Sequence, residues 1–278
     1  MKWLILADIH ANLPALKVVL EDIEKKCPGI ISSKDRSQGK IVSLGDQIGY
    51  NPYPNEVMDI VWSVADEILI GNHEISVHDA LTQDSLNEDL NSDALWAVYW
   101  TAKNLSNTNK DRLKQLIEQK KYQVTYDGIC FVHGSPDDPK KMNYIFSGKE
   151  AQSLYFHNRK DPSRICFVGH THEPKIFTYG SKVVRHLTKS NYSKSFRHKI
   201  DPVNSGKYPL GDFEKALIVV PSVGQPRDGH NHTGYAIYDS ENNCVELIRL
   251  PYDIDKVQSE MRSLGFPWLL INRLNEGE

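Results

Sequence analysis

The sequence predicts an α/β fold, and three patterns lead to this prediction. Short runs rich in Ile, Val and Phe recur along the chain, and such runs are typical of strands buried on both faces. Stretches with apolar residues at helical spacing separate the early runs. Polar residues able to bind metal ions follow the runs directly, and open α/β sheets bind ligands beyond the carboxyl ends of their strands. We therefore expect these strand ends to converge.

Five apolar runs supply the strands of the predicted ligand site. Each run ends beside potential metal ligands, usually next to a glycine that lets the backbone turn tightly. The runs and the polar residues that follow them are KWLIL at 2–6 before Asp8 and His10, KIVSL at 40–44 before Asp46, EILI at 67–70 before Asn72 and His73, ICFV at 129–132 before His133, and a second ICFV at 165–168 before His170 and His172.

Helical patterns lie between the early strands. The first predicted helix begins after Asn12, a residue type that caps helix N-termini, and stops at Pro28–Gly29. A second begins at Pro54 and continues through Val64. Residues 91–105 predict a third helix, and residues 106–119 predict a fourth that starts at a Ser or Asn.

The second half of the chain is richer in strands. Its predicted strands are KIFTY at 175–179, KVVRHL at 182–187, ALIVV at 216–220, GYAIYD at 234–239 and CVELIRL at 244–250. A polar stretch at 188–214 interrupts them and predicts an insertion or lid, because strand patterns resume beyond it. We expect one domain over 1–252, and a tail at 253–278 whose two helices pack on that domain.

Composition argues against several classes of function. The 278 residues are 40% apolar and 25% charged, as in an ordinary soluble globular protein. A net charge of −3 gives no electrostatic basis for general nucleic-acid binding. No apolar stretch is long enough to cross a bilayer, and Asp8 interrupts the opening run, unlike a signal peptide. The four cysteines are far apart in sequence, so we expect reduced thiols and a cytoplasmic protein.

Each polar motif at a strand end is ambiguous when taken alone. Asp8 and His10 can belong to a capped turn, and Asp46 can be an ordinary turn carboxylate. His133 can be a hydrogen-bonded histidine near the core. Two histidines one residue apart in GHTH are harder to explain as a turn, so the combination of motifs indicates a metal centre.

The ligand types predict two transition-metal ions. A mixture of imidazole and carboxylate suits Mn²⁺, Fe, Zn²⁺ or Ni²⁺ better than Ca²⁺ or Mg²⁺, which prefer oxygen ligands alone. More ligands are present than one ion needs, so two ions, divalent or of mixed valence, are the simplest interpretation. Two metals roughly 3.5–4 Å apart hold the attacking and leaving oxygens during phosphoryl displacement.

Five motifs in order resemble those of the calcineurin-like metallophosphoesterases. They are DIHAN, GDQIGYNPYPNE, GNHE, VHGSP and GHTHEP, and the resemblance extends from Asp8 to about Arg249, weakest across 188–214. It is strongest to small bacterial and archaeal members of phosphodiesterase type, although VPSVG replaces the more usual Asn-Pro-Gly-Ser-Val-Gly form. The resemblance implies a four-layer αββα sandwich, in which two mixed β-sheets pack face to face with helices outside.

The resemblance also implies a role for each ligand. A hydroxide held between the two ions would attack phosphorus in line with the leaving oxygen. His73 would stabilise the transition state or protonate the leaving group. The implied ligands are Asp8, His10 and His172 for the first ion, Asn72, His133 and His170 for the second, and Asp46 as the bridge between them.

Further residues are candidates for substrate binding. Arg227 in GQPRDG is either an exposed turn residue or a guanidinium that pairs with a substrate phosphate. Tyr50 lies just past Asp46 and can line the same cleft as Asn72 and His73.

We interpret the chain as a dinuclear phosphoesterase acting on phosphodiester or phosphomonoester bonds. The expected substrate is a small phosphorylated molecule, such as a dinucleoside polyphosphate or another nucleotide. Three alternatives stay open: a protein phosphatase of the same fold, a non-catalytic metal-binding scaffold for protein interaction, and a hydrolase of non-phosphate esters. The intact ligand set, with His73 present, argues against the scaffold.

Overall fold

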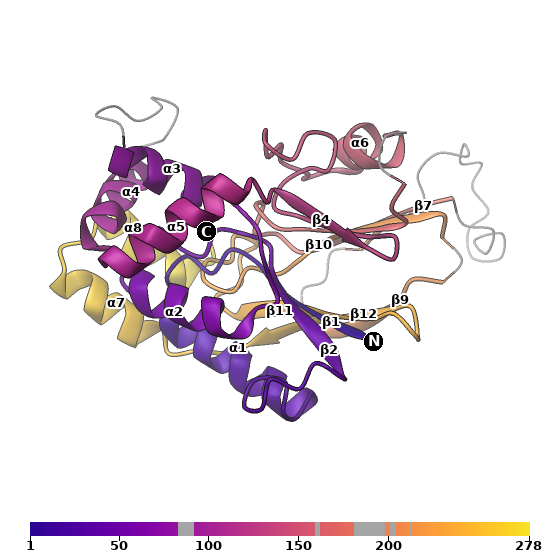
Figure 1. Ribbon diagram of the computed structural model, residues 1–278, viewed down its shortest axis with the longest axis horizontal. Coiled ribbons are helices and arrows are strands. Elements are labelled where there is room, and N and C mark those ends of the chain that lie inside the picture. The colour runs from indigo at the N-terminus through magenta and orange to yellow at the C-terminus, as the bar shows by residue number, and fades with distance from the viewer. Residues whose placement is uncertain (83–91, 159–161, 181–197, 201–203, 212) are drawn as a thin grey trace.

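Two mixed β-sheets pack face to face at the centre of the protein, with helices on their outer faces (Figure 1). The computed structural model describes residues 1–82, 92–158, 162–180, 198–200, 204–211 and 213–278. The predicted α/β class and the αββα sandwich are both confirmed.

The first sheet has the strand order β3-β2-β1-β11-β12-β9. Strands β1, β2 and β3 are parallel, so their carboxyl ends lie at one edge, and β11, β12 and β9 extend the sheet with antiparallel pairs. The bounds are β1 Lys2–Leu6, β2 Gly39–Ser43, β3 Glu67–Ile68, β9 Gly206–Pro209, β11 Thr233–Asp239 and β12 Cys244–Leu250.

The second sheet has the order β4-β5-β6-β10-β7-β8. Its central strands β5, β6 and β10 are parallel, and antiparallel strands flank them on both sides. The bounds are β4 Gln123–Tyr126, β5 Ile129–Val132, β6 Ile165–Val168, β7 Lys175–Tyr179, β8 His198–Ile200 and β10 Lys215–Val219.

Helices cover both outer faces and one end of the sandwich. In Figure 1, α1 and α2 lie against the first sheet, α6 lies against the second, and the yellow α7 lies beside α1. The bounds are α1 Leu13–Lys26, α2 Pro54–Val64, α3 Asn72–Thr82, α4 Ser92–Asn104, α5 Asn107–Gln119, α6 Gly148–Ala151, the π-helical segment η1 Gln152–Phe156, α7 Ile254–Ser263 and α8 Trp268–Glu276.

Strand periodicity divides the apolar side chains between two layers of core. Successive side chains of a strand point to opposite faces, so Trp3 of β1 enters the core between the sheets while Leu4 packs under α1. Phe131 of β5 and Phe167 of β6 face Trp3 across that inner core, with their own ring centroids 5.6 Å apart. The buried runs therefore fix the strand ends, from which the polar turns emerge.

Helix caps agree with the predicted starts of two helices. The Asn12 side chain accepts a hydrogen bond from the Ala15 amide at 3.2 Å, and the Ser106 hydroxyl accepts one from the Asn109 amide at 3.2 Å. Each cap satisfies an amide that would otherwise lack a partner at the first turn. Both predicted caps are confirmed.

Several elements differ from the sequence prediction. The run EILI forms a strand only at Glu67–Ile68, because its last two residues already turn towards the loop before α3. Helix α3, segment α6–η1 and strand β4 were not predicted, since their polar and half-exposed residues give a weak periodic signal. The predicted strand at 182–187 lies outside the described residues.

The predicted insertion at 188–214 contains two edge strands. Strand β8 pairs with β7 in the second sheet, and β9 pairs with β12 in the first. Residues 188–197, 201–203 and 212 of this stretch lie outside the described part of the chain, and the lid role stays a prediction.

The tail at 253–278 packs through its two helices. Phe266, between them, contacts the rings of Trp96 and Trp100 on α4 at 4.8 and 4.7 Å between centroids. Leu270 and Leu274 of α8 are buried in the same cluster. The tail thereby covers one side of α4 and reaches the loop that carries Tyr50.

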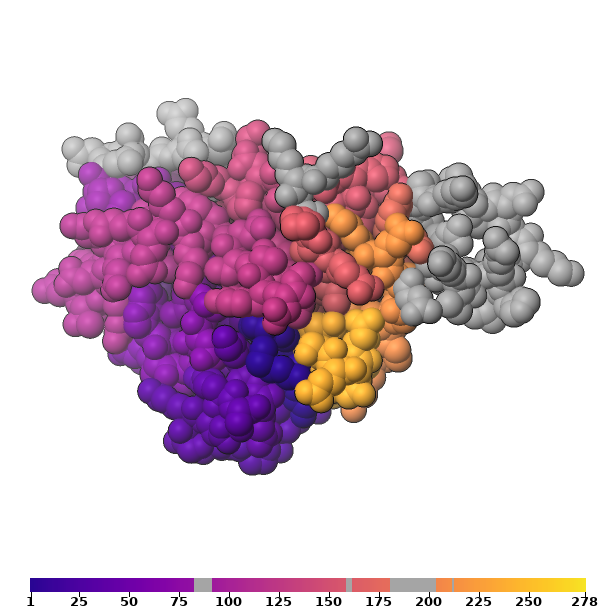
Figure 2. Space-filling model, turned by 45° about the vertical axis from the view of Figure 1, so that its right-hand side comes forward, coloured from indigo at the N-terminus to yellow at the C-terminus, as the bar shows by residue number. Residues whose placement is uncertain are grey.

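The N-terminal residue, Met1, lies at the surface beside the turn between β11 and β12. Figure 2 shows the indigo N-terminal residues next to this gold segment, where the Met1 amino group donates to Glu241 at 2.8 Å. Within the described ranges, no helix combines the length and apolar character needed to cross a membrane.

Candidate metal centre

The turns that follow β1, β2, β5 and β6 bring the predicted ligands into one buried group. Parallel strands in each sheet end on the same side, and the two sheets face each other, so side chains far apart in sequence meet. Two clusters of metal-binding side chains result, each with its ligand atoms within 4.8 Å of one another. The clusters are Asp8, His10, Asp46 and His172, and Asp46, His133 and His170.

In the first cluster two imidazole nitrogens face each other. His10 Nε2 lies 3.2 Å from His172 Nε2 and 3.7 Å from Asp46 Oδ2. His172 Nε2 is in turn 3.5 Å from Asp8 Oδ1. All four side chains are buried.

Backbone carbonyls fix the tautomer of both histidines in this cluster. His10 Nδ1 lies 3.2 Å from the Ile48 carbonyl oxygen, and His172 Nδ1 contacts the Gln225 carbonyl oxygen. A carbonyl only accepts, so each Nδ1 carries the hydrogen and each Nε2 presents a bare lone pair. Two lone pairs 3.2 Å apart repel each other unless a cation lies between them. The donor set therefore fits a metal ion, with the carbonyls orienting the ligands.

The second cluster is built around His133. Its Nε2 lies 3.1 Å from His170 Nδ1, 3.1 Å from Asn72 Oδ1 and 3.3 Å from Asp46 Oδ2. Asp46 belongs to both clusters, and its Oδ2 lies near an imidazole nitrogen of each: 3.7 Å from His10 Nε2 and 3.3 Å from His133 Nε2. One carboxylate oxygen between two groups of imidazoles is the arrangement expected of a bridging ligand.

Asp46 is oriented by the backbone of the neighbouring loop. Its Oδ1 accepts a hydrogen bond from the His73 amide at 2.9 Å, which leaves Oδ2 directed at the clusters. A side chain on Gly71 would lie 2.1 Å from Oδ1, so only glycine permits this approach. The GNH segment consequently orients Asp46 and also places Asn72 beside His133.

Glu74 connects the same two loops and has no counterpart among the predicted site residues. Its buried carboxylate accepts hydrogen bonds from the amides of Asp46, Gln47 and Gly71 at 2.8–2.9 Å. Burial raises the pKa of Glu74 to about 7. Glu74 is the last residue of the GNHE motif, which could have marked it as a candidate. Its three hydrogen bonds to main-chain amides, however, cannot be predicted from the order of residues in a motif.

The ligand turns adopt a strained backbone. Left-handed φ angles are uncommon for residues other than glycine, and each one costs on the order of 1 kcal/mol or more. Such strain persists where surrounding structure enforces it, and here it coincides with the candidate ligands. The candidate ligands with positive φ are Asp8, His10, Asp46, His170 and His172.

Burial keeps most of the histidines neutral. It lowers the pKa of His170 to about 3 and holds those of His10 and His172 well below the usual range. Neutral imidazole is the form that binds metal ions. Burial also opposes protonation of His133, but the Asp46 and Asp8 carboxylates outweigh it and raise its pKa to about 9.

The two carboxylates of the clusters differ in protonation. Burial opposes ionisation of Asp46, but His133 beside it holds the pKa of Asp46 well below its usual range. Burial raises the pKa of Asp8 to about 7. At neutral pH, Asp8 and His133 therefore still hold protons that a metal ion must displace.

The predicted substrate-binding residues lie beside the first cluster. The His73 ring is 4.7 Å from the His10 ring and 4.5 Å from the Tyr50 ring, measured between centroids. The Arg227 guanidinium lies over Tyr50, 5.8 Å from its centroid. Burial lowers the pKa of His73 to about 4, so this imidazole is neutral.

Tyr144 is a neighbour of the second cluster that sequence reasoning missed. Its ring stacks on His170 with centroids 3.9 Å apart and planes 16° apart. Phe146 stacks on Tyr144 with centroids 5.3 Å apart and planes 11° apart. Neither residue belongs to a motif or a periodic segment, so the pattern offered no signal for them.

Comparison with known proteins identifies the family. A profile of the calcineurin-like phosphoesterase family matches residues 1–196. The chain belongs to this family. It is therefore a hydrolase of phosphoric esters, and its Asp and His clusters can bind metal ions.

Relatives of this phosphoesterase cover its whole length. The uncharacterised protein MJ0912 of Methanocaldococcus jannaschii is 30% identical over 273 residues, 97% of this chain and 96% of that protein. A crystal structure of a metallophosphoesterase from Sphaerobacter thermophilus is 29% identical, with a TM-score of 0.77 over 100% of both chains. The hypothetical protein PH1004 from Pyrococcus horikoshii is 17% identical, with a TM-score of 0.71 over 100% of this chain and 98% of that one, which shows a shared fold.

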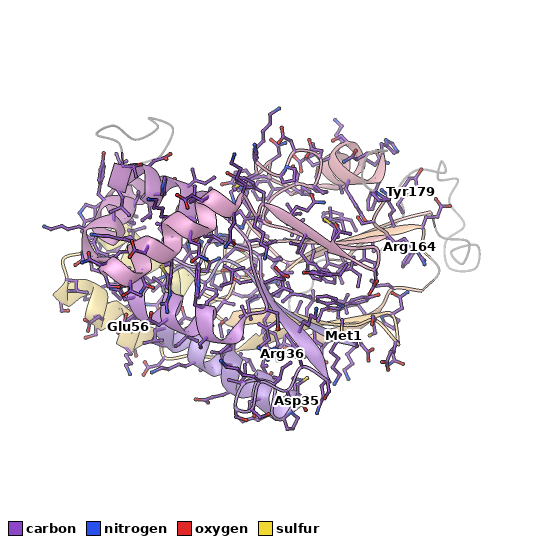
Figure 3. The ribbon with its side chains drawn as sticks, in the orientation of Figure 1. Met1, Asp35, Arg36, Glu56, Arg164 and Tyr179 are labelled. Carbon is purple, nitrogen blue, oxygen red and sulfur yellow. The ribbon has the colours of Figure 1, made fainter. Side chains whose placement is uncertain are left out.

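A separate cavity of about 450 Å³ lies at the other end of the strands. Its lining includes the amino-terminal residues of β1, β5 and β6, whereas the ligands follow the carboxyl ends. In Figure 3, Met1 and Arg164, which line this cavity, lie away from Glu56 of α2. The phosphoesterase centre therefore does not use this cavity.

Asp46→Asn tests the shared oxygen. Loss of the carboxylate charge is expected to weaken both metal sites together, by about tenfold or more each, because both clusters approach Asp46 Oδ2. Elemental analysis after dialysis against buffered metal measures the occupancy of each site. Asp111→Asn, an exposed change on α5, serves as the charge-matched control. Loss of one ion with full retention of the other would contradict the bridge.

Metal uptake is expected to release protons at neutral pH. His133, with its pKa raised to about 9, and Asp8, raised to about 7, are protonated in part or in full and must lose protons to bind. Affinity should therefore rise as the pH rises towards 9, and proton release should fade above it. Calorimetric titration in two buffers of different ionisation enthalpy counts the protons. Release of none near pH 7 would contradict the raised pKa values of His133 and Asp8.

Proposed function

We propose that this phosphoesterase works through two transition-metal ions and acts on a small nucleotide, such as a dinucleoside polyphosphate. The observation that supports two ions is the single Asp46 oxygen placed between two groups of imidazoles. When bound, the ions supply an acidified water and neutralise charge on the phosphate oxygens. The residues proposed to hold them are Asp8, His10 and His172 for one, Asn72, His133 and His170 for the other, and Asp46 for both.

His73 is the proposed catalytic side chain beside these ligands. Its amide holds Asp46, while its ring extends over His10 and Tyr50. Its Nδ1 is buried with no hydrogen-bond partner among the described residues, and Gly49 leaves just enough room for it. Because the imidazole is neutral, we assign it donation of a hydrogen bond to charge that develops on the substrate.

An aromatic stack supports a nucleotide as the substrate. Tyr144 stacks on His170 of the second cluster, and Phe146 stacks on Tyr144. Tyr144 and Phe146 are 45% and 42% exposed, unusual for large apolar rings beside a buried polar site. A nucleobase stacks on aromatic faces with a gain of about 1–3 kcal/mol per base. A phosphate at the metal centre would place the attached base near this platform.

The remaining alternatives make different predictions about substrates. A protein phosphatase would prefer a phosphopeptide over a nucleotide, and an esterase for non-phosphate esters would not be inhibited competitively by inorganic phosphate. A scaffold would bind metal without turnover. The complete donor set argues against the scaffold, because all seven candidate ligands converge.

His73→Ala separates catalysis from metal binding. With bis-p-nitrophenyl phosphate and Mn²⁺, we expect kcat to fall by about 10²–10⁴-fold, as for loss of a positioned hydrogen-bonding group. Metal content should stay at the wild-type level, since Asp46 is held by the His73 amide and not by its ring. His78→Ala, on the same helix, is the matched control. Altered metal content without a rate defect would refute the catalytic role.

Phe146→Ala tests the nucleobase platform. Loss of the exposed ring should raise KM for a dinucleoside polyphosphate about tenfold, because one stacking surface is removed. The inhibition constant of inorganic phosphate, which has no base, should change much less. Phe146→Tyr should retain most of the affinity, and Tyr99→Ala removes an equally exposed ring from α4 as a control. Equal effects on both ligands would argue against stacking.

A further inference from the structure

Two arginines from distant parts of the chain meet at the Tyr50 ring. Arg227 lies in the loop after β10, and its guanidinium carbon is 5.8 Å from the ring centroid. Arg273 lies on α8, and its guanidinium carbon is 5.4 Å from the same centroid. The ring itself contacts His10 and His73, at 4.8 and 4.5 Å between centroids. Both cations therefore lie next to the first metal cluster.

Neither guanidinium forms an ion pair with a side-chain carboxylate of the described residues, and Arg227 also has a buried nitrogen without a partner. Arg227 Nη2 donates to Gln225 Oε1 at 2.9 Å, but its Nε is buried without a hydrogen-bond acceptor. Arg273 Nε donates to the main-chain oxygen of Glu278 at 2.6 Å. No side-chain carboxylate among the described residues forms an ion pair with either arginine, whereas neighbouring Arg249 pairs with Asp228. A buried donor without a partner is costly, which indicates that an acceptor belongs there.

The two like charges also repel each other. Burial lowers the pKa of Arg273, and the positive charge of Arg227 lowers it further. The Arg273 charge in turn contributes to the low pKa of His73. The Asp93 and Glu278 charges oppose the lowering of the Arg273 pKa, but that pKa stays lowered, so the two cations create a local positive potential.

The metal centre does not compensate for this potential. Two divalent ions would bring four positive charges, and Asp8 and Asp46 are the carboxylates that the clusters offer in return. Glu74 is fully engaged by three amides. The region around Tyr50 therefore suits an anion with more charge than one phosphodiester carries.

We infer that Arg227 and Arg273, which both contact the Tyr50 ring, form an anion subsite that holds a second phosphate group of the substrate. The substrate class is then a molecule with directly linked phosphates, one at the metal centre and the next at the arginines. Guanidinium forks match phosphate oxygens bidentately. The inference rests on the proposed phosphoesterase function. It assigns a binding role to α8, which lies beyond the 1–196 region shared with the family profile.

Binding of a bisphosphonate tests the subsite independently of turnover. Methylenediphosphonate carries two linked phosphonates that phosphoester hydrolysis does not cleave, and inorganic phosphate carries one group. Calorimetry on the metal-loaded protein should show the diphosphonate binding about tenfold or more tightly than phosphate. Arg273→Gln should remove most of this preference, while Arg262→Gln, a tail arginine that bonds to Gln258, should keep it. Absence of the preference in the wild type, or its survival in Arg273→Gln, overturns the inference.

Kinetics distinguish binding from a structural role. Arg273→Gln should lower kcat/KM for a dinucleoside polyphosphate about tenfold or more further than for bis-p-nitrophenyl phosphate. Arg273→Lys keeps the positive charge but lacks the paired N–H donors of a guanidinium. It should therefore restore part of the preference for the dinucleoside polyphosphate. Equal losses on both substrates, together with a lower Tm, would mean that Arg273 only supports the fold. Absence of wild-type turnover on either substrate would refute the proposed function, and the diphosphonate preference would still decide the subsite.

Discussion

The position of the Asp46 carboxylate is the constraint on which the site depends. Its two oxygens have separate partners: Oδ1 accepts from the His73 amide, and Oδ2 lies between the imidazoles of both clusters. Glu74 fastens the loop that carries Asp46 to the loop that carries Gly71, through buried hydrogen bonds to both. Because these bonds are to main-chain amides in a dry interior, a shift of one loop displaces the bridge and both clusters together.

The sandwich supplies the rigidity that this arrangement needs. Turns with left-handed backbone at non-glycine residues are unfavourable in isolation, and the ligand turns contain several of them. They are held by strands whose side chains are buried on both faces. Hydrogen bonds between loops also hold them: the Ser222 hydroxyl donates to the Asp8 carbonyl at 3.0 Å and accepts from the Gln225 amide at 2.9 Å. Gln225 then positions His172 through its carbonyl. The serine of the VPSVG segment, Ser222, therefore connects the Asp8 turn to the Gln225 loop.

Sequence reasoning identified the parts of the site that lie at strand ends. An apolar run followed by Gly and a ligand is a local pattern, so β1, β2, β5 and β6 and the residues after them were predictable. Glu74, Tyr144 and Arg273 were not, because each acts through contacts between segments far apart in sequence. Arg273 in particular lies on the polar side of an amphipathic helix, where an arginine is ordinary. The edge strand β9 carries Gly206 and Pro209, residues that disfavour a strand prediction.

The division of the chain suggests how chemistry and selectivity are separated in this protein. Every candidate metal ligand lies within 1–196, the region that matches the family profile. The guanidiniums at Tyr50 come from beyond it, and Arg273 lies on α8, whose Leu270 and Leu274 are buried in one cluster with Ala94 and Ala97 of α4. If the arginines bind a second phosphate, the preference of the hydrolytic centre for linked phosphates comes from residues outside the region that matches the family profile. The packing of α8 in the buried cluster would then hold Arg273 in place for that role.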